Sequence, residues 1–572
     1  MQNETPIEQT PHTGAEADTR TDRGAADHDV QAPTPLMPSP ISPISPISPL
    51  SPMTLLSRGA ANFVLATASA TCALIVLDTN VVAVSLPSIA RSFHASFADV
   101  EWVVSAYMVA FASCLLPAGG LADRLGRKKM LLLGLAVFFL ASLGCAIAPS
   151  VWFLNVSRAV KGVGAAMLLT SALAVIANTF HEGAPRARAW AIWGMCMGVA
   201  TTIAPLVGGV ITQWLGWRWI FLLNLPVCTA LAVSVHYSIR ESRNPHAGPI
   251  DAAGSTLFGL ALALGIWALI GTQSDGWTSW ATAARFTGSV VLLISFVSLE
   301  RVREHGMIDL SLFKQRRFVA AVLAMFGYAS CAQVMMTFLP LYLQNAFGFS
   351  AIAAGVGMLP FAICMILGPR LGAVLSQRFS STALLVFGLG LIAAGNLLTA
   401  LVAQDARFVL IALATCVTGL GAGVLNGDTQ KAIMACVPAH RTGMASGIST
   451  TTRFTAIVMS VGVLGAALAA RTRTTLAPSL LSIPGAHEHV GPDFMSRVLA
   501  GDAAQAVSSI PQDLRVAILA VARESFASGF ASALCIAGIV AACAAFGVWM
   551  LAGRVYGRAS TATQVAGQPP AA

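Results

Sequence analysis

Long apolar runs separated by short polar segments make up most of the sequence after residue 60. Each run is about 20 residues long, the length that an α-helix needs to cross the hydrocarbon core of a bilayer. Backbone N–H and C=O groups find no water in that core, so an isolated run of this kind has to be helical. The chain is therefore expected to be an all-α protein that crosses a membrane many times.

The composition supports a membrane protein and argues against other classes. Of the 572 residues, 56% are hydrophobic and 10% are charged, a balance that a soluble protein of this size could not bury. The net charge of +9 comes mostly from short loops between apolar runs, where it indicates orientation rather than nucleic-acid binding. The 11 cysteines fall in apolar runs and are interpreted as buried small hydrophobes, without a disulfide framework or zinc site.

The runs divide the chain into five regions with about fourteen spans in all. Residues 1–57 are predicted to be a disordered cytoplasmic tail, 58–240 a six-helix bundle, and 241–316 a linker with two extra spans. Residues 317–552 form a second six-helix bundle, and 553–572 a second cytoplasmic tail. The Ser-Pro repeats of the first tail are interpreted as a tolerated extension or a docking ligand, and translation could begin at Met53. The expected spans are 61–89, 101–121, 130–148, 151–180, 189–214, 219–237, 252–271, 284–302, 318–343, 351–375, 382–403, 408–434, 443–469 and 525–551.

Charge placement orients these spans. With the N-terminus in the cytoplasm, most loop arginines and lysines fall on the inner side, which favours an even number of spans and both ends inside. The short outer loops then keep only Arg91, Arg218, Arg285 and Arg407. Residues 471–524 form an unusually long outer segment that is expected to have some fold of its own, as a gate, a partner contact or a passive hairpin.

One basic turn organises the first half. Residues 119–129 read Gly-Gly-Leu-Ala-Asp-Arg-Leu-Gly-Arg-Lys-Lys and join two apolar runs. Its glycines let helices approach closely, and its aspartate can meet an arginine or a helix N-terminus. The turn resembles the loop between the second and third helices of the major facilitator superfamily of secondary transporters. That resemblance implies a loop that latches the inward gate, formed by Gly119, Asp123, Arg124, Gly126 and Arg127.

The first span carries a carboxylate, Asp78. A charge in hydrocarbon is costly, so this side chain should face the bundle interior or water. Residues 77–87 are similar to the first-helix signature of the 14-span drug:proton antiporters, Leu-Asp-x-Thr-x-Val-x-x-Ala-Leu-Pro, from which Asn80, Ala83 and Ser85 depart. The resemblance implies that Asp78 takes up and releases a proton; a structural ion pair is the alternative. Asn80 is a candidate residue of the substrate cavity.

The fourth span contributes two cations, Arg158 and Lys161, next to a face of small residues that permits close packing. Arg158 is the natural counter-charge for Asp78. The segment is similar to the family pattern Arg-x-x-Gln-Gly-x-Gly, whose arginine is implicated in proton coupling, with Lys161 in place of the glutamine. Lys161 either adds positive potential as a cavity residue or snorkels away and does little.

Two further segments match the same branch. Trp102 and Tyr107 are similar to a Trp-x-x-x-x-Tyr pattern and serve either as interfacial and packing aromatics or as substrate contacts. Residues 204–209 resemble the Gly-Pro-x-x-Gly-Gly antiporter motif. They predict a helix bend and close helix contact at Pro205, Gly208 and Gly209. Residues 217–226, Trp-Arg-Trp-Ile-Phe-Leu-Leu-Asn-Leu-Pro, are interpreted as mainly structural.

The second half has few charges. Asp428 and Lys431 lie toward the cytoplasmic end of their span, where they either pair near the interface or act at a gate or in substrate binding. Arg453 lies near mid-span and is a candidate for lining the substrate cavity. With one peripheral carboxylate here and cations at Arg158, Lys161 and Arg453, neutral, zwitterionic or anionic amphipathic substrates are expected in preference to dications.

The resemblance covers residues from about 60 to 552. It implies two six-helix bundles related by a pseudo-two-fold, two inserted helices and cytoplasmic termini. It also implies a bacterial inner-membrane antiporter that exports small amphipathic molecules in exchange for protons by alternating access, without a cofactor, metal or nucleic acid. A periplasmic adaptor and an outer-membrane channel are candidate partners. The alternatives are an uptake transporter on the same scaffold and, with no catalytic motif in its favour, a membrane enzyme or sensor.

Overall fold

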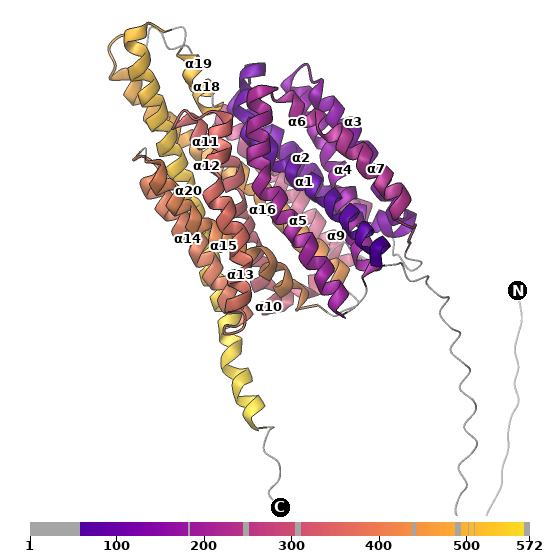
Figure 1. The fold of residues 1–572 in the computed structure, drawn as a ribbon. Coiled ribbons are helices and arrows are strands. Elements are labelled where there is room, and N and C mark those ends of the chain that lie inside the picture. The colour runs from indigo at the N-terminus through magenta and orange to yellow at the C-terminus, as the bar shows by residue number, and fades with distance from the viewer. Residues whose placement is uncertain are drawn as a thin grey trace, which may run out of the picture. The chain divides into compact units, whose positions relative to one another are not determined.

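The computed structural model describes residues 58–180, 183–243, 251–303, 310–405, 407–437, 442–486, 494–500, 503–507 and 510–565. Over these residues it contains 14 helical segments that are long and apolar enough to cross a membrane. The expected all-α, many-span fold class is confirmed (Figure 1). The predicted tail 1–57 lies outside the described residues.

The first six spans follow one another along the chain. Ser96 and Asp99 form a capping box before the second span, and Ser150 caps the fourth, so local sequence sets these starts. Leu223 keeps helical torsions and joins two short helices into the sixth span. The helices are α1 (Arg58–Phe93), α2 (Phe97–Leu125), α3 (Arg127–Ala146), α4 (Val151–Thr179), α5 (Gly183–Trp214), α6 (Arg218–Leu222) and α7 (Asn224–Ser238).

Two inserted spans follow, α8 (Ala252–Asp275) and α9 (Trp280–Val302). Helix α8 packs against α2 of the first half, against α16 (Thr442–Leu481) of the second half, and against α9. Helix α9 exposes large apolar side chains along its length, including Trp280, Val291 and Ile294. This face suits contact with lipid.

The second half repeats the six-span plan with two interruptions. The first of its spans contains a π-helical turn, η2, between two α-helices, and such turns often occur at functional sites. The next span is divided at Met358. Its elements are η1 (Leu310–Lys314), α10 (Arg316–Tyr328), η2 (Ala329–Gln333), α11 (Met335–Asn345), α12 (Ala351–Gly357), α13 (Leu359–Leu375), α14 (Ser381–Val402), α15 (Phe408–Met434), α16, α18 (Phe494–Ala500), α19 (Ala503–Ala506) and α20 (Gln512–Val565).

The outer segment 471–524 is largely a continuation of two spans. Helix α16 runs on to Leu481 and α20 already begins at Gln512, so both ends of the segment are helical. Leu476, Phe494 and Ile518 contribute to a separate small apolar core that joins these extensions to α18 and α19. At its other end α20 continues to Val565, so much of the predicted tail 553–572 is helical.

The two halves are in close contact where α5 meets α12. A Cβ on Gly209 would lie 2.6 Å from the carbonyl oxygen of Ala351, and one on Gly355 would lie 2.5 Å from that of Pro205. Nearby, Gln344 donates to the carbonyl oxygen of Val84 at 2.9 Å, which links α11 to α1. In the expected topology these are outer ends, so the halves are sealed on the outer side.

We expect Gly355→Val to prevent this seal, because any side chain at this position meets backbone rather than a movable side chain. Transport should fall while membrane insertion is retained. Spin labels at Trp214 and Val356, which are 75% and 49% exposed, should report a longer distance between α5 and α12 than in the parent chain. Gly194→Val on α5 is the matched control, because a Cβ there meets nothing within 4 Å. An unchanged label distance in Gly355→Val would contradict the assignment of this seal.

Candidate functional site

Three ionisable side chains form a buried cluster in the first half. Asp78 comes from α1, and Arg158 and Lys161 come from α4. Arg158 Nη1 lies 3.0 Å from Asp78 Oδ2, and Lys161 Nζ lies 2.5 Å from Asp78 Oδ1. Asn224, at the start of α7, donates from Nδ2 to Asp78 Oδ1 at 2.9 Å. The carboxylate thus accepts hydrogen bonds from three side chains, of which two are cations.

The sequence of α4 explains how these donors converge. A spacing of three residues puts Arg158 and Lys161 on the same face of the helix. Gly162 and Gly164 let neighbouring helices come close to that face. A Cβ on Gly162 would lie 2.3 Å from the carbonyl oxygen of Tyr107 on α2, and one on Gly164 would lie 2.9 Å from the backbone nitrogen of Phe138 on α3. The small residues hold α4 between α2 and α3.

Aromatic rings enclose both cations. The Arg158 guanidinium lies 4.3 Å from the ring centroid of Tyr107, and its Nε donates to the carbonyl oxygen of Val103 at 2.9 Å. Lys161 Nζ lies 4.6 Å from the ring of Phe138 and 4.9 Å from that of Phe221. A cation over a ring face is stabilised by the negative face of the π system. This wall replaces water around the cluster.

Burial excludes the snorkelling interpretation of Lys161 in this structure. The side chains of Asp78 and Arg158 are each 1% exposed, and that of Lys161 is 0% exposed. The alternative in which Lys161 snorkels away is therefore wrong here. The Lys161 ammonium group remains in the interior because the carboxylate of Asp78 lies within hydrogen-bond distance. The side chain has no path to water along which it could snorkel. Asp78 faces the interior of the first bundle, as a charge at mid-span should.

The two other cavity candidates of this half do not share one surface. Asn80 is half-buried and its Nδ2 donates to the carbonyl oxygen of Val76 in its own helix at 2.7 Å, so it stays apart from the cluster. Tyr107 is fully buried and forms part of the wall over Arg158. Its ring also stacks on Phe111 at 5.9 Å. In this conformation Tyr107 is a packing residue of the cluster.

A second cation occupies the other half. Arg453 on α16 donates from Nε to Gln333 Oε1 at 2.7 Å and from Nη2 to Asn426 Oδ1 at 3.2 Å. Tyr328 adds its hydroxyl oxygen at 3.4 Å from Nη2. Gln333 is the last residue of the π-helical turn. All these partners are neutral, and within the described part of the chain no carboxylate pairs with Arg453.

The basic turn between α2 and α3 is anchored within its own half. Arg127 pairs with Asp123 at 2.9 Å. Gly126 has φ +115°, and a Cβ there would lie 2.3 Å from the carboxylate of Glu241, a residue that sequence reasoning did not select. Glu241 accepts from the backbone nitrogens of Lys128 and Lys129, each at 3.2 Å, and so caps the start of α3.

The remaining members of the predicted gating loop make looser contacts. A Cβ on Gly119 would be in ordinary contact, 3.9 Å, with Thr170 of α4, and Arg124 is exposed. Their part in an inward gate stays a prediction.

Two further predicted groups act through packing or at the surface. Within α5, Pro205 and Gly209 contact the second half as described above, and a Cβ on Gly208 would lie 2.9 Å from the carbonyl oxygen of Val81 on α1. Lys431 Nζ lies 3.0 Å from Asp428 Oδ1, and the lysine side chain is 78% exposed. This exposed contact between Lys431 and Asp428 fits the alternative in which the two residues form an ion pair near the membrane interface.

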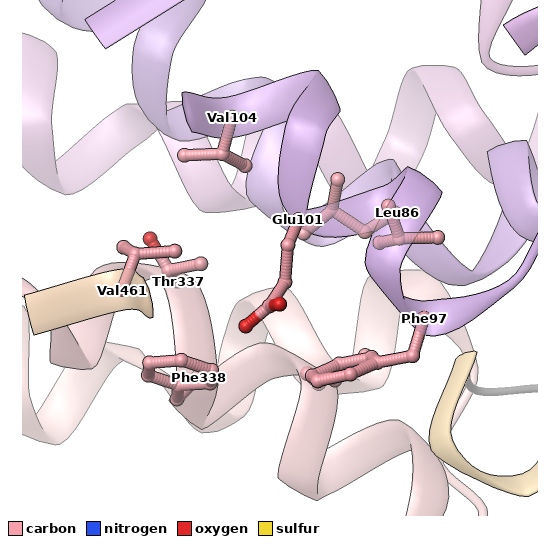
Figure 2. Close-up of a pocket in the computed structure, with 9 residues that line it drawn as sticks. Leu86, Phe97, Glu101, Val104, Thr337, Phe338 and Val461 are labelled. Atoms are coloured by element: carbon pink, nitrogen blue, oxygen red, sulfur yellow. The ribbon is translucent and has the colours of Figure 1, made fainter. Parts of the chain in front are cut away.

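Sequence reasoning missed three buried acids, Glu101, Asp251 and Glu300. Glu101 was taken as the boundary of the second span, but α2 begins at Phe97, and Glu101 is 4% exposed. Figure 2 shows it in a small pocket between the halves, lined by Leu86, Phe97, Val104, Thr337, Phe338 and Val461. Its Oε1 also fills the space over Gly465 of α16, where a Cβ would lie 1.5 Å away. The sequence feature that could have indicated Glu101 was an acidic residue at the start of an apolar run.

Asn224 was also missed, because residues 217–226 were interpreted as structural. We expect Asn224→Ala to lower the free energy of unfolding by about 1.5–3 kcal/mol, the usual range for a hydrogen bond to a charged group. Thermal unfolding in detergent micelles would measure it. Thr229→Ala on the same helix is the control, since that exposed hydroxyl bonds only back to Leu225, and its effect should stay within about 0.5 kcal/mol. Equal stability of both variants would contradict the role of Asn224.

The chain is similar in sequence to known drug-resistance and efflux proteins. The chain is 32% identical over 410 residues to the multidrug resistance protein Stp of Mycobacterium tuberculosis, covering 71% of this chain and 76% of that protein. It is 32% identical to the multidrug efflux pump LfrA of Mycolicibacterium smegmatis, with 83% and 93% covered. The tetracenomycin C resistance and export protein of Streptomyces glaucescens is 28% identical, with 82% and 88% covered.

Among solved structures, a bacterial homologue of the human lysosomal transporter Spinster, in an inward-facing and unoccupied conformation, aligns with a TM-score of 0.59 and 17% identity. The alignment covers 86% of this chain and 99% of that one, and it supports the fold. The Major Facilitator Superfamily model matches residues 68–463. The chain is a multi-pass membrane transporter, not an enzyme, and it belongs to the Major Facilitator Superfamily.

Proposed function

We propose that the protein exports small amphipathic molecules, antibiotics among them, across a bacterial cytoplasmic membrane in exchange for protons. Relatives named for multidrug efflux and antibiotic resistance support the direction and the substrate class. The observation that carries proton exchange is the dry cluster of Asp78, Arg158 and Lys161. Ionisable groups are costly in a membrane and mark proton or ion pathways there.

The proposed cycle needs no cofactor and is driven by the proton gradient. Substrate binds near mid-membrane between the halves, which rock about it. The contacts of α5 with α12 and of α11 with α1 would form the outer gate in one state and separate in the other. Proton binding to the cluster and substrate binding would favour different states, which is what couples the two fluxes.

The proposed substrate preference rests on the ionisable residues of the second half. Arg453 is a cation near mid-span whose partners among the described residues are neutral, so an acidic group on a substrate could neutralise it. Asp428, in contrast, is already paired near the surface. We therefore assign neutral, zwitterionic or anionic amphipathic compounds to this transporter in preference to dications.

Outer partners are part of this proposal. A periplasmic adaptor and an outer-membrane channel would receive the exported compound. The helical extensions of α16 and α20 with α18 and α19 offer such an adaptor a folded outer surface.

We expect Asp78→Asn to abolish proton-coupled export while the protein still inserts, because the amide cannot balance two buried cations. Proteoliposomes with an imposed pH gradient would measure it, and they also distinguish export from uptake by the direction of accumulation. Asp275→Asn is the control, since that exposed carboxylate at the end of α8 pairs with Arg285 of α9. Full drug resistance in cells expressing Asp78→Asn would refute the proposal.

We expect Arg453→Gln to reduce export of monocarboxylate compounds by about tenfold or more, the size of one charge-assisted contact. Neutral compounds should be affected less, because they do not use the charge. A resistance panel in an efflux-deficient host, with neutral, zwitterionic, anionic and dicationic compounds, would measure the pattern. Arg407→Gln, an exposed arginine before α15, is the matched control. Protection against dicationic dyes alone would overturn the substrate assignment.

A further inference from the structure

The cluster contains more positive than negative charge. When Asp78, Arg158 and Lys161 are all ionised, the cluster has a net charge of +1 in a site where each of these side chains is at most 1% exposed. Adding a proton to Asp78 in this state would leave two adjacent cations with no anion. Removing a proton from a cation would leave a neutral cluster. Since burying uncompensated charge is expensive, these two changes are not equivalent.

Only one of the two cations can supply that proton. A guanidinium is not deprotonated in proteins, whereas a lysine ammonium can become a neutral amine when it is desolvated. Arg158 is also held by the carbonyl oxygen of Val103 as well as by Asp78. Lys161 has Asp78 as its hydrogen-bond acceptor and otherwise faces two aromatic rings.

We propose that Lys161 carries the coupled proton, alternating between ammonium and amine, while Asp78 stays ionised as the partner of Arg158. This inference rests on the proposed proton exchange and names the group that performs it. On release, one N–H bond of the ammonium breaks, its electron pair stays on Nζ, and the proton passes to water. Loading is the reverse step, so each turnover of this residue moves one proton.

The groups around Lys161 are compatible with both forms. The neutral amine keeps N–H groups that can still donate to Asp78, and Asn224 continues to donate to the same carboxylate oxygen. The thiols and the phenol nearby add no charge in their ordinary neutral forms. The titratable groups that face the cluster are Asp78 on α1, Tyr107 on α2, Cys145 on α3, Arg158 on α4 and Cys228 on α7.

Burial of Lys161 agrees with a carrier that is sealed during part of the cycle. Its side chain is 0% exposed here, with the outer ends of the halves in contact. Exchange with water therefore takes place in another state, when the helices around the cluster separate. Water can reach a proton-carrying group from only one side of the membrane at a time, since otherwise protons would cross without driving export.

The test compares two opposite substitutions at this one position. Lys161→Arg keeps a permanent cation and fixes the proton-loaded charge, whereas Lys161→Met removes it and fixes the unloaded charge. The readout is the binding of radiolabelled chloramphenicol, a neutral amphipath with no group that titrates in this range, to the purified full-length protein between pH 5.5 and pH 8.5. In the unsubstituted protein, affinity should rise with pH by about tenfold or more, within the usual range of coupling between two ligands.

Both variants should lose the pH dependence of ligand affinity, but their affinities should differ in opposite directions from that of the parent chain. Lys161→Arg should bind weakly and Lys161→Met tightly at every pH, and neither should be driven by a proton gradient in proteoliposomes. Lys314→Met, at an exposed position in η1, should behave like the parent chain. Parent-like pH dependence in Lys161→Arg or in Lys161→Met would overturn the assignment to Lys161.

Measurements on the parent chain and infrared spectra distinguish failure of the proposed function from failure of the assignment to Lys161. A parent chain without pH-dependent binding or gradient-driven transport would contradict the proposed function itself rather than the role of Lys161. If Lys161→Arg does not fold in the tight aromatic site, infrared spectra of the parent chain decide instead. A protonated-carboxyl band that appears on acidification and is absent in Asp78→Asn would show that the acid carries the proton. No such band is expected.

Discussion

A carboxylate held between two cations in the middle of a membrane is the interaction on which the first half of this structure depends. Each ion taken from water costs several kcal/mol, so none of the three could be buried alone. Asp78 satisfies Arg158 and Lys161 together, and Asn224 completes its hydrogen bonding. The helices that supply them, α1, α4 and α7, are therefore joined through this one cluster.

The cluster is connected by packed rings to the cation of the second half. Arg158 lies over Tyr107, Tyr107 stacks on Phe111, and Phe111 meets Phe454 of α16 edge-on at 4.3 Å. Arg453 is the residue before Phe454. Close-packed side chains transmit displacement because they leave little free volume. Packed rings therefore extend from Arg158 to the residue that follows Arg453 in the chain.

Small residues set where the two halves can meet. At the outer ends, Gly209 and Gly355 remove the side chains that would keep α5 and α12 apart. Within the first half, Gly162 brings α4 against α2 and so positions the cations. Glycine thus serves two purposes here: close contacts that build the buried cluster and close contacts between the two halves.

Hydrophobic run length and loop charges determined much of the protein in advance. The spans and the all-α class were predictable because lipid requires each apolar run of this length to be a helix. The family was predictable only through the resemblance of residues 77–87, 119–129 and 204–209 to its motifs. Asp78, Arg158 and Lys161 stood out because charges are rare in such runs. The predicted spans 443–469 and 525–551 were shorter than α16 and α20, whose outer extensions pack in a separate apolar core.

Which side chains meet could be decided only by the tertiary structure. Sequence reasoning could not settle whether Lys161 joins the cluster, and it passed over Asn224 and Glu101. The reason is that each contact involves residues far apart in the chain: Asn224 lies 146 positions from Asp78. The sequence by itself determined that charges are buried and on which helices. The packing of α1, α4 and α7 decided how they pair, because periodicity fixes the face of a helix but not its neighbour.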